Sequence, residues 1–91
     1  MHQSLVIIPT YNEKENIERI LRAVMTLPNP YEVLVVDDNS PDGTRTIIER
    51  LQTEFEGKIH LLKRAGKQGL GTAYIDGFKW ALEGKYDYIF E

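Results

Sequence analysis

The sequence of 91 residues contains no cysteine and no long apolar run. The lack of cysteine excludes disulfides and thiolate-bound metals. No apolar stretch approaches the roughly 20 residues that a helix needs to cross a membrane, and no signal peptide fits the N-terminus. The formal net charge of -3 lacks the basic character expected of a nonspecific nucleic-acid-binding protein. A hydrophobic fraction of 42% is enough for the core of one small domain.

Short apolar runs alternate with amphipathic stretches along the whole chain. The apolar runs predict strands at residues 4–8, 33–37, 58–63 and 86–90. Apolar residues at helical spacing predict helices around 17–24, around 47–55 and over 72–82. This alternation is typical of an α/β fold, with a parallel sheet of about four strands and flanking helices in the order β-α-β-α-β-α-β.

Residue types at the element ends suggest where the helices begin and what the third helix buries. Asn12 is the predicted N-cap of the first helix, and Ser40 is that of the second, with Pro41 at its first position. The negative charge of Asp42 in the first turn is then expected to stabilise the second helix through the positive end of the helix dipole. The predicted buried residues of the third helix are Tyr74 or Ile75, Phe78 and Leu82.

Polar residues follow the first three predicted strands. The segment 9–13 (PTYNE) follows the first strand, Asp37 and Asp38 end the second, and Lys63, Arg64 and Lys67 follow the third. Parallel strands bring these loops to one edge of the sheet, where ligands bind in open α/β sheets. An aromatic ring, carboxylates and cations in one place suit the base, ribose and phosphates of a nucleotide. The residues alone therefore indicate a nucleotide-binding α/β half-domain.

Three segments also carry a resemblance to a known family. These are 9–13 (PTYNE), 35–44 (VVDDNSPDGT) and 69–74 (GLGTAY). In order and spacing they resemble the inverting family 2 glycosyltransferases of GT-A fold, and within these the dolichol-phosphate (polyprenol monophosphate) mannose synthases. The resemblance implies the N-terminal nucleotide-binding half of a GT-A Rossmann-like fold, with strand order 3-2-1-4.

The resemblance also implies an activity and a set of binding residues. The activity is transfer of mannose from GDP-mannose to a polyprenyl (dolichyl) phosphate with inversion. Asp38 and Val36 would hold the base and ribose end of the donor. The implied nucleotide-sugar-binding residues are Pro9, Tyr11, Glu13, Val36 and Asp38, with Asp37, Arg64 and Lys67 as further candidates.

A divalent cation, Mg²⁺ or Mn²⁺, is implied for the full-length enzyme. In the family an Asp-x-Asp motif directly after the fourth strand binds it, a position beyond Glu91, so we expect no catalytic or metal residue in this chain. We expect residues 1–91 to be a single partial domain, inactive alone, and an exposed edge of the fourth strand to favour self-association. The implied location is cytoplasmic, at the cytoplasmic face of a membrane.

Two alternatives stay open at this point. The first is a family 2 transferase that passes another sugar, such as glucose from a UDP donor, to a polyprenyl phosphate. The second is a receiver-like signalling domain, because these domains also carry an acidic pair after a strand. In receiver domains, however, the pair follows the first strand and a phosphoacceptor aspartate follows the third, where this chain has Lys63 and Arg64.

Overall fold

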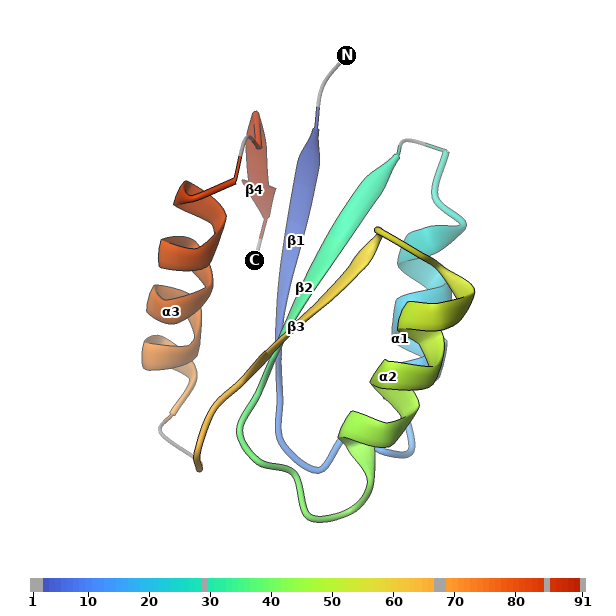
Figure 1. Cartoon of the computed structure of the whole chain (residues 1–91), viewed down its shortest axis with the longest axis vertical. Helices are drawn as coiled ribbons and strands as arrows, with labels where there is room; N and C mark the ends of the chain where they lie inside the picture. Colours follow the sequence, from blue (N-terminus) through green and yellow to red (C-terminus); the bar gives the residue numbers. More distant parts are fainter. Residues whose placement is uncertain (1–2, 29, 67–68, 85, 91) are drawn as a thin grey trace.

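A computed structural model describes residues 3–28, 30–66, 69–84 and 86–90 of the chain. Strands and helices alternate as the sequence predicts (Figure 1). The elements are β1 (Ser4–Thr10), α1 (Ile17–Met25), β2 (Tyr31–Asp37), α2 (Thr44–Glu54), β3 (Ile59–Lys63), α3 (Leu70–Leu82) and β4 (Tyr88–Phe90).

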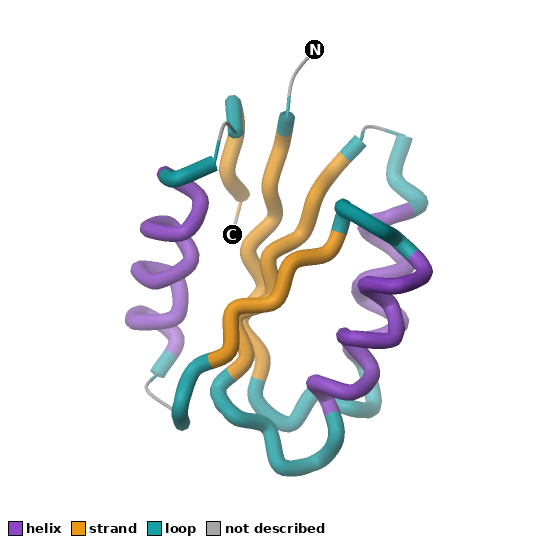
Figure 2. The backbone as a smooth tube through the Cα atoms, viewed as in Figure 1, coloured by secondary structure: helices purple, strands orange, loops and turns teal. Residues whose placement is uncertain are grey.

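The four strands form one parallel sheet in the order β3-β2-β1-β4, which is the predicted order. β1 pairs with β2 from Ser4 opposite Tyr31 to Thr10 opposite Asp37. The loops that follow β1, β2 and β3 consequently gather at one end of the molecule (Figure 2). This end carries the polar residues that the sequence places after the strands.

β2 is buried on both faces, as its continuous apolar run predicts. Val33 and Val35 belong to the core cluster under α1 and α2, whereas Leu34 and Val36 belong to the cluster under α3. All four side chains are fully buried. Figure 1 shows the same division, with α3 on one side of the sheet and α1 and α2 on the other.

α3 approaches the sheet through small residues, which the hydrophobic pattern did not predict. Its fully buried positions are Ala73, Gly77 and Ala81, spaced four residues apart. A Cβ atom at Gly77 would lie 2.8 Å from the Cγ2 atom of Ile7. Tyr74 and Phe78, which were predicted to be buried, are partly buried and pack against this core. The prediction that Leu82 is buried is wrong, because its side chain is 76% exposed. The face of α3 that meets the sheet consists of small residues instead.

β1 is longer than predicted and continues through Pro9 to Thr10. Pro9 lies opposite Val36 of β2, and the described residues of β4 pair with Ser4–Val6.

β4 lies at the edge of the sheet beside β1. Its aromatic residues Tyr88 and Phe90 are about half exposed, at 51% and 46%. Within the described ranges, every helix is too short or too polar to span a membrane.

Candidate nucleotide site

Backbone hydrogen bonds extend the sheet beyond the last strand residues and align the three loops. The Asp38 N–H group donates to the Thr10 carbonyl at 3.0 Å, and the Arg64 N–H group donates to the Asp37 carbonyl at 2.8 Å. Asp38 is therefore fixed between the end of β1 and the end of β3. The sheet thus positions the backbone of Asp38.

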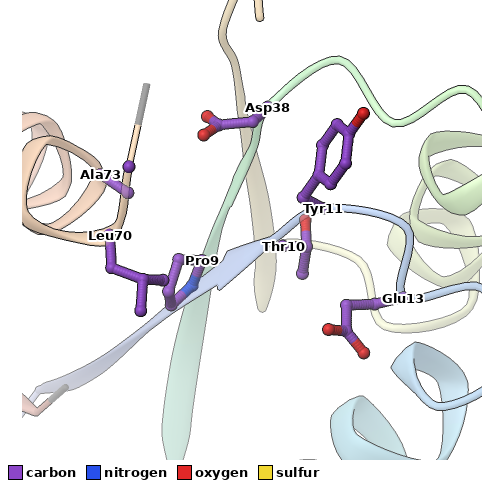
Figure 3. Close-up of a pocket in the computed structure, with 8 residues that line it drawn as sticks. Pro9, Thr10, Tyr11, Glu13, Asp38, Leu70 and Ala73 are labelled. Atoms are coloured by element: carbon purple, nitrogen blue, oxygen red, sulfur yellow. The ribbon is translucent and has the colours of Figure 1, made fainter. Parts of the chain in front are cut away.

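A pocket of about 260 Å³ opens at this edge of the sheet (Figure 3). The ends of β1 and β2 form one side, and the start of α3 forms the other. Figure 3 shows the Tyr11 ring and the Asp38 carboxylate at one margin and the apolar Leu70 and Ala73 at another. The lining residues are Pro9, Thr10, Tyr11, Glu13, Asp38, Gly69, Leu70 and Ala73.

Asp38 is held in this pocket by Arg64. Arg64 Nε donates to Asp38 Oδ1 at 2.5 Å, and Nη2 donates to Oδ2 at 2.9 Å. The two side chains are only 4% and 8% exposed. A bidentate guanidinium–carboxylate pair fixes the plane of the carboxylate as well as its position. The hydrogen bond to Asp38, partly opposed by burial, raises the pKa of Arg64 above its ordinary value, so its positive charge is permanent.

Asp37 points into a different environment and is fully buried. Oδ1 accepts hydrogen bonds from Thr10 Oγ1 at 2.7 Å and Ser40 Oγ at 2.6 Å. Oδ2 accepts from the Ser40 N–H group at 3.0 Å and from Arg45 Nε at 2.7 Å. Burial alone would raise the pKa of Asp37, but the hydrogen bonds from Ser40, Thr10 and Arg45 together hold it below its ordinary value.

The loop after β2 supports the loop after β1. Three consecutive backbone N–H groups, of Asn12, Glu13 and Lys14, donate to side chains of the β2–α2 segment. The acceptors are Ser40 Oγ at 2.9 Å, Thr44 Oγ1 at 3.1 Å and Asp42 Oδ2 at 3.1 Å. These contacts fix the segment that carries Tyr11 and Glu13 at the pocket.

This support replaces the predicted helix caps. The prediction that Asn12 caps the first helix is wrong, since α1 begins at Ile17 and Asn12 has a left-handed backbone with φ 56°. The prediction that Ser40 caps the second is also wrong, because α2 begins at Thr44 after Gly43. Instead, the Asn12 backbone N–H group donates to Ser40 Oγ, so the two residues join loops that are distant in sequence.

The structure separates the predicted site residues into two groups. Pro9, Tyr11, Glu13 and Asp38 line the pocket together. Val36 is fully buried in the core under α3, and the Asp37 carboxylate is bound by the loops. Arg64 does not line the pocket but pairs with Asp38, and Lys67 lies outside the described residues. The binding roles of all of these residues stay predictions.

Several residues of the site were missed by sequence reasoning. Thr10, Leu70 and Ala73 line the pocket, and Arg45 contacts both Asp37 and the Arg64 carbonyl oxygen. Thr10 lies in segment 9–13 after the first apolar run, and Leu70 lies in the third motif, so their positions carried a signal. Arg45 has no local signal, since its partners are distant in the chain.

The described residues do not fit a bound divalent cation. In those ranges no group of three or more His, Asp or Glu side chains is placed to hold a metal ion. Asp37 and Asp38 each pair with an arginine instead. Both adjacent carboxylates are thus engaged by guanidinium groups of the protein.

Comparison with known proteins places this site in a family. The sequence pattern of Glycosyl transferase family 2 matches residues 5–90. The chain belongs to glycosyl transferase family 2. Membership of this family rules out the receiver-domain alternative.

Two curated relatives of this family 2 chain are similar over nearly its whole length. The polyprenol monophosphomannose synthase of Mycolicibacterium smegmatis is 43% identical over 89 residues, which are 98% of this chain and 34% of that protein. The undecaprenyl-phosphate mannosyltransferase of Micrococcus luteus is 46% identical over 87 residues, or 96% of this chain and 35% of that protein. The chain thus spans about a third of the length of these relatives.

A solved structure confirms the fold of this family 2 chain. The mannosyltransferase PcManGT from Pyrobaculum calidifontis, in complex with GDP-Man and Mn²⁺, superposes with a TM-score of 0.79 at 32% identity. The match covers 86% of this chain and 24% of that chain. The predicted α/β fold of GT-A, Rossmann-like type is therefore confirmed.

Proposed function

We propose that this chain is the nucleotide-sugar-binding part of an inverting mannosyltransferase. The enzyme would pass mannose from GDP-mannose to a polyprenyl (dolichyl) phosphate at the cytoplasmic face of a membrane. The observation that carries the proposal is the pocket at the carboxyl ends of β1 and β2, which joins an aromatic ring, Tyr11, to an oriented carboxylate, Asp38. The names of the two curated relatives and of the solved mannosyltransferase support the choice of sugar and acceptor.

The pocket suits the nucleoside end of such a donor. An aromatic face can stack on a base, and a carboxylate oxygen accepts hydrogen bonds from base N–H or ribose hydroxyl groups. The apolar start of α3, with Leu70 and Ala73, offers a second surface opposite these polar groups. Pro9 and Glu13 complete the lining on the β1 side. Mg²⁺ or Mn²⁺ belongs to the proposed whole enzyme, and we assign this chain no step that depends on it.

Residues 1–91 would be a single partial domain, the N-terminal nucleotide-sugar-binding half of the proposed transferase. This partial domain has two core clusters on opposite faces of a single sheet, and β2 contributes to both. The edge of β4, with the half-exposed Tyr88 and Phe90, would mediate self-association of this partial domain. Analytical ultracentrifugation should then show an average mass that rises with concentration, and a constant monomer mass would contradict it.

A titration with two nucleotide sugars tests the proposed donor. GDP-mannose and UDP-glucose are each added to the ¹⁵N-labelled chain, and backbone amide shifts are followed by NMR. We expect GDP-mannose to bind more tightly and to shift the amides of Tyr11, Asp38 and Leu70. Binding of UDP-glucose alone would favour the other-sugar transferase. Binding of neither, or shifts confined to residues far from the pocket, would contradict the proposed site.

A further inference from the structure

Arg64 makes more hydrogen bonds than it would need if its only task were to stabilise the buried Asp38 carboxylate. Its residue is 7% exposed, and it does not line the pocket. Two of its five N–H groups hold the Asp38 carboxylate. The other contacts reach across to the start of α3, on the opposite side of the pocket.

These further contacts join Arg64 to the β3–α3 loop and to α3. Nη2 donates to the Gly69 carbonyl oxygen at 3.3 Å. Nη1 donates to Thr72 Oγ1 at 3.1 Å and to Asp76 Oδ2 at 2.9 Å. Since Gly69 and Asp38 both line the pocket, one guanidinium group connects its two sides.

All five N–H donors of this guanidinium therefore have an acceptor within the protein. A guanidinium has five N–H groups in a fixed planar fork, and the contacts of Arg64 match this number, with one from Nε, two from Nη1 and two from Nη2. No donor is left to bind a phosphate group of a nucleotide. A lysine at this position would supply a single charged point with three donors and could not hold both sides at once.

We propose that Arg64 is a positioning residue that orients the Asp38 carboxylate for the nucleoside and sets the spacing between Asp38 and the start of α3. The inference rests on the proposed function, because it takes the pocket to be the nucleoside site. Arg64 acts through Asp38 and contacts no ligand itself. The role differs from a direct contact with the base or phosphates of the nucleotide, which the family resemblance implied for Arg64 as a further candidate.

The substitution Arg64→Lys tests this role with two ligands, guanosine and GDP, in NMR titrations of the chain. We expect both ligands to bind about tenfold more weakly, which corresponds to one hydrogen bond to a charged group. If Arg64 bound phosphate, GDP would lose affinity and guanosine would not. Arg22→Lys is the matched control, since Arg22 is bidentate to Glu54 at 2.5 and 2.8 Å far from the pocket, and it should change neither affinity.

A double substitution separates positioning from general stability. If Arg64 acts through Asp38, adding Arg64→Lys to Asp38→Asn should weaken guanosine binding by less than about twofold beyond Asp38→Asn alone. Independent, multiplying losses would contradict the proposal. Wild-type chain that binds neither guanosine nor GDP would overturn both this inference and the proposed function. Wild-type binding together with an unchanged Arg64→Lys affinity would overturn this inference alone.

A measurement on the unsubstituted chain covers the case in which Arg64→Lys does not fold. The side-chain Nε–H resonances of the arginines are recorded while guanosine is added. The Arg64 resonance should shift, because Asp38 accepts a further hydrogen bond from the ligand, and the Arg22 resonance should not. An unmoved Arg64 resonance at saturating guanosine would contradict the proposal.

Discussion

Asp37 is the last residue of β2, Asp38 follows it directly and both are buried, yet they serve opposite sides of the sheet. Asp37 joins the loops after β1 and β2 and pairs with Arg45, away from the pocket. Asp38 faces the pocket and pairs with Arg64, which reaches to α3. Each arginine offsets the cost of burying one carboxylate. The comparison shows that an acidic pair need not act as a pair: here one carboxylate supports the loops and the other faces the candidate ligand.

The largest effect should come from removing the support at Asp37. Asp37→Ala deletes the acceptor of four hydrogen bonds from Thr10, Ser40 and Arg45. We expect a loss of about 3–5 kcal/mol in the free energy of unfolding, the usual cost of breaking a buried ion pair. Urea unfolding followed by circular dichroism measures it. A loss below about 1 kcal/mol would mean that the loops do not depend on Asp37.

On the face of the sheet that carries Asp38, stability should depend on how closely α3 packs. Gly77→Ala places a Cβ atom 2.8 Å from Ile7 Cγ2, so helix or side chain must move. We expect about 1–3 kcal/mol of destabilisation from overpacking, measured by thermal unfolding. Gly71→Ala on the same helix is the control, because nothing lies within 4 Å of its Cβ position. That change should be neutral or stabilising; equal losses at both positions would contradict close packing at Gly77.

Acid should lower the free energy of unfolding partly through protonation of Asp37. Substitution of Asp37 should remove this part of the pH dependence. The pKa of Asp37 is lower in the folded chain than in the unfolded chain, so the unfolded state binds more protons. The stability from Asp37 is therefore complete above about pH 4 and is lost as the pH falls towards the folded pKa, at no more than about 1.4 kcal/mol per pH unit. Urea unfolding between pH 2 and 5 should show a shallower slope for Asp37→Asn than for wild type. Parallel slopes would contradict the assigned role.

The smallest effect is expected at the hydroxyl that links the two loops. Ser40 Oγ donates to Asp37 and accepts from the Asn12 N–H group. Ser40→Ala should cost about 0.5–1.5 kcal/mol and broaden or shift the amide resonance of Asn12. Thr53→Ala on the exposed surface of α2 is a hydroxyl deletion that should leave that resonance unchanged. An unaffected Asn12 amide in Ser40→Ala would contradict the contact.

Much of the fold could be predicted from the sequence because it depends on local patterns. The apolar runs around Val6 and Val35 fix two strands, the alternation with helices fixes a parallel sheet, and the sheet direction brings Tyr11, Asp37 and Asp38 to one edge. These inferences use periodicity and direction, which a single sequence contains.

The parts that were missed depend on contacts between distant residues. Ser40 and Asn12 both have the side chain of a helix cap, and nothing in the sequence shows that they meet across 28 positions. The separation of Asp37 from Asp38 follows from Arg45 and Arg64, whose partners also lie far along the chain. Leu82 was expected to be buried because it is apolar, but small residues such as Gly77 decide which face of α3 meets the sheet.

The most direct test of the split between the two carboxylates compares Asp37→Asn and Asp38→Asn, for which we measure GDP-mannose affinity and urea stability under the same conditions. We expect Asp38→Asn to bind GDP-mannose at least about tenfold more weakly than wild type, and Asp37→Asn, while folded, to stay within about threefold. The order of stability loss should be reversed, since the hydrogen bonds that Asp37 accepts from Thr10, Ser40 and Arg45 join the loops after β1 and β2 to α2. Equal losses of affinity, or a larger loss in Asp37→Asn, would contradict the assignment of Asp38 to the ligand and Asp37 to the loops.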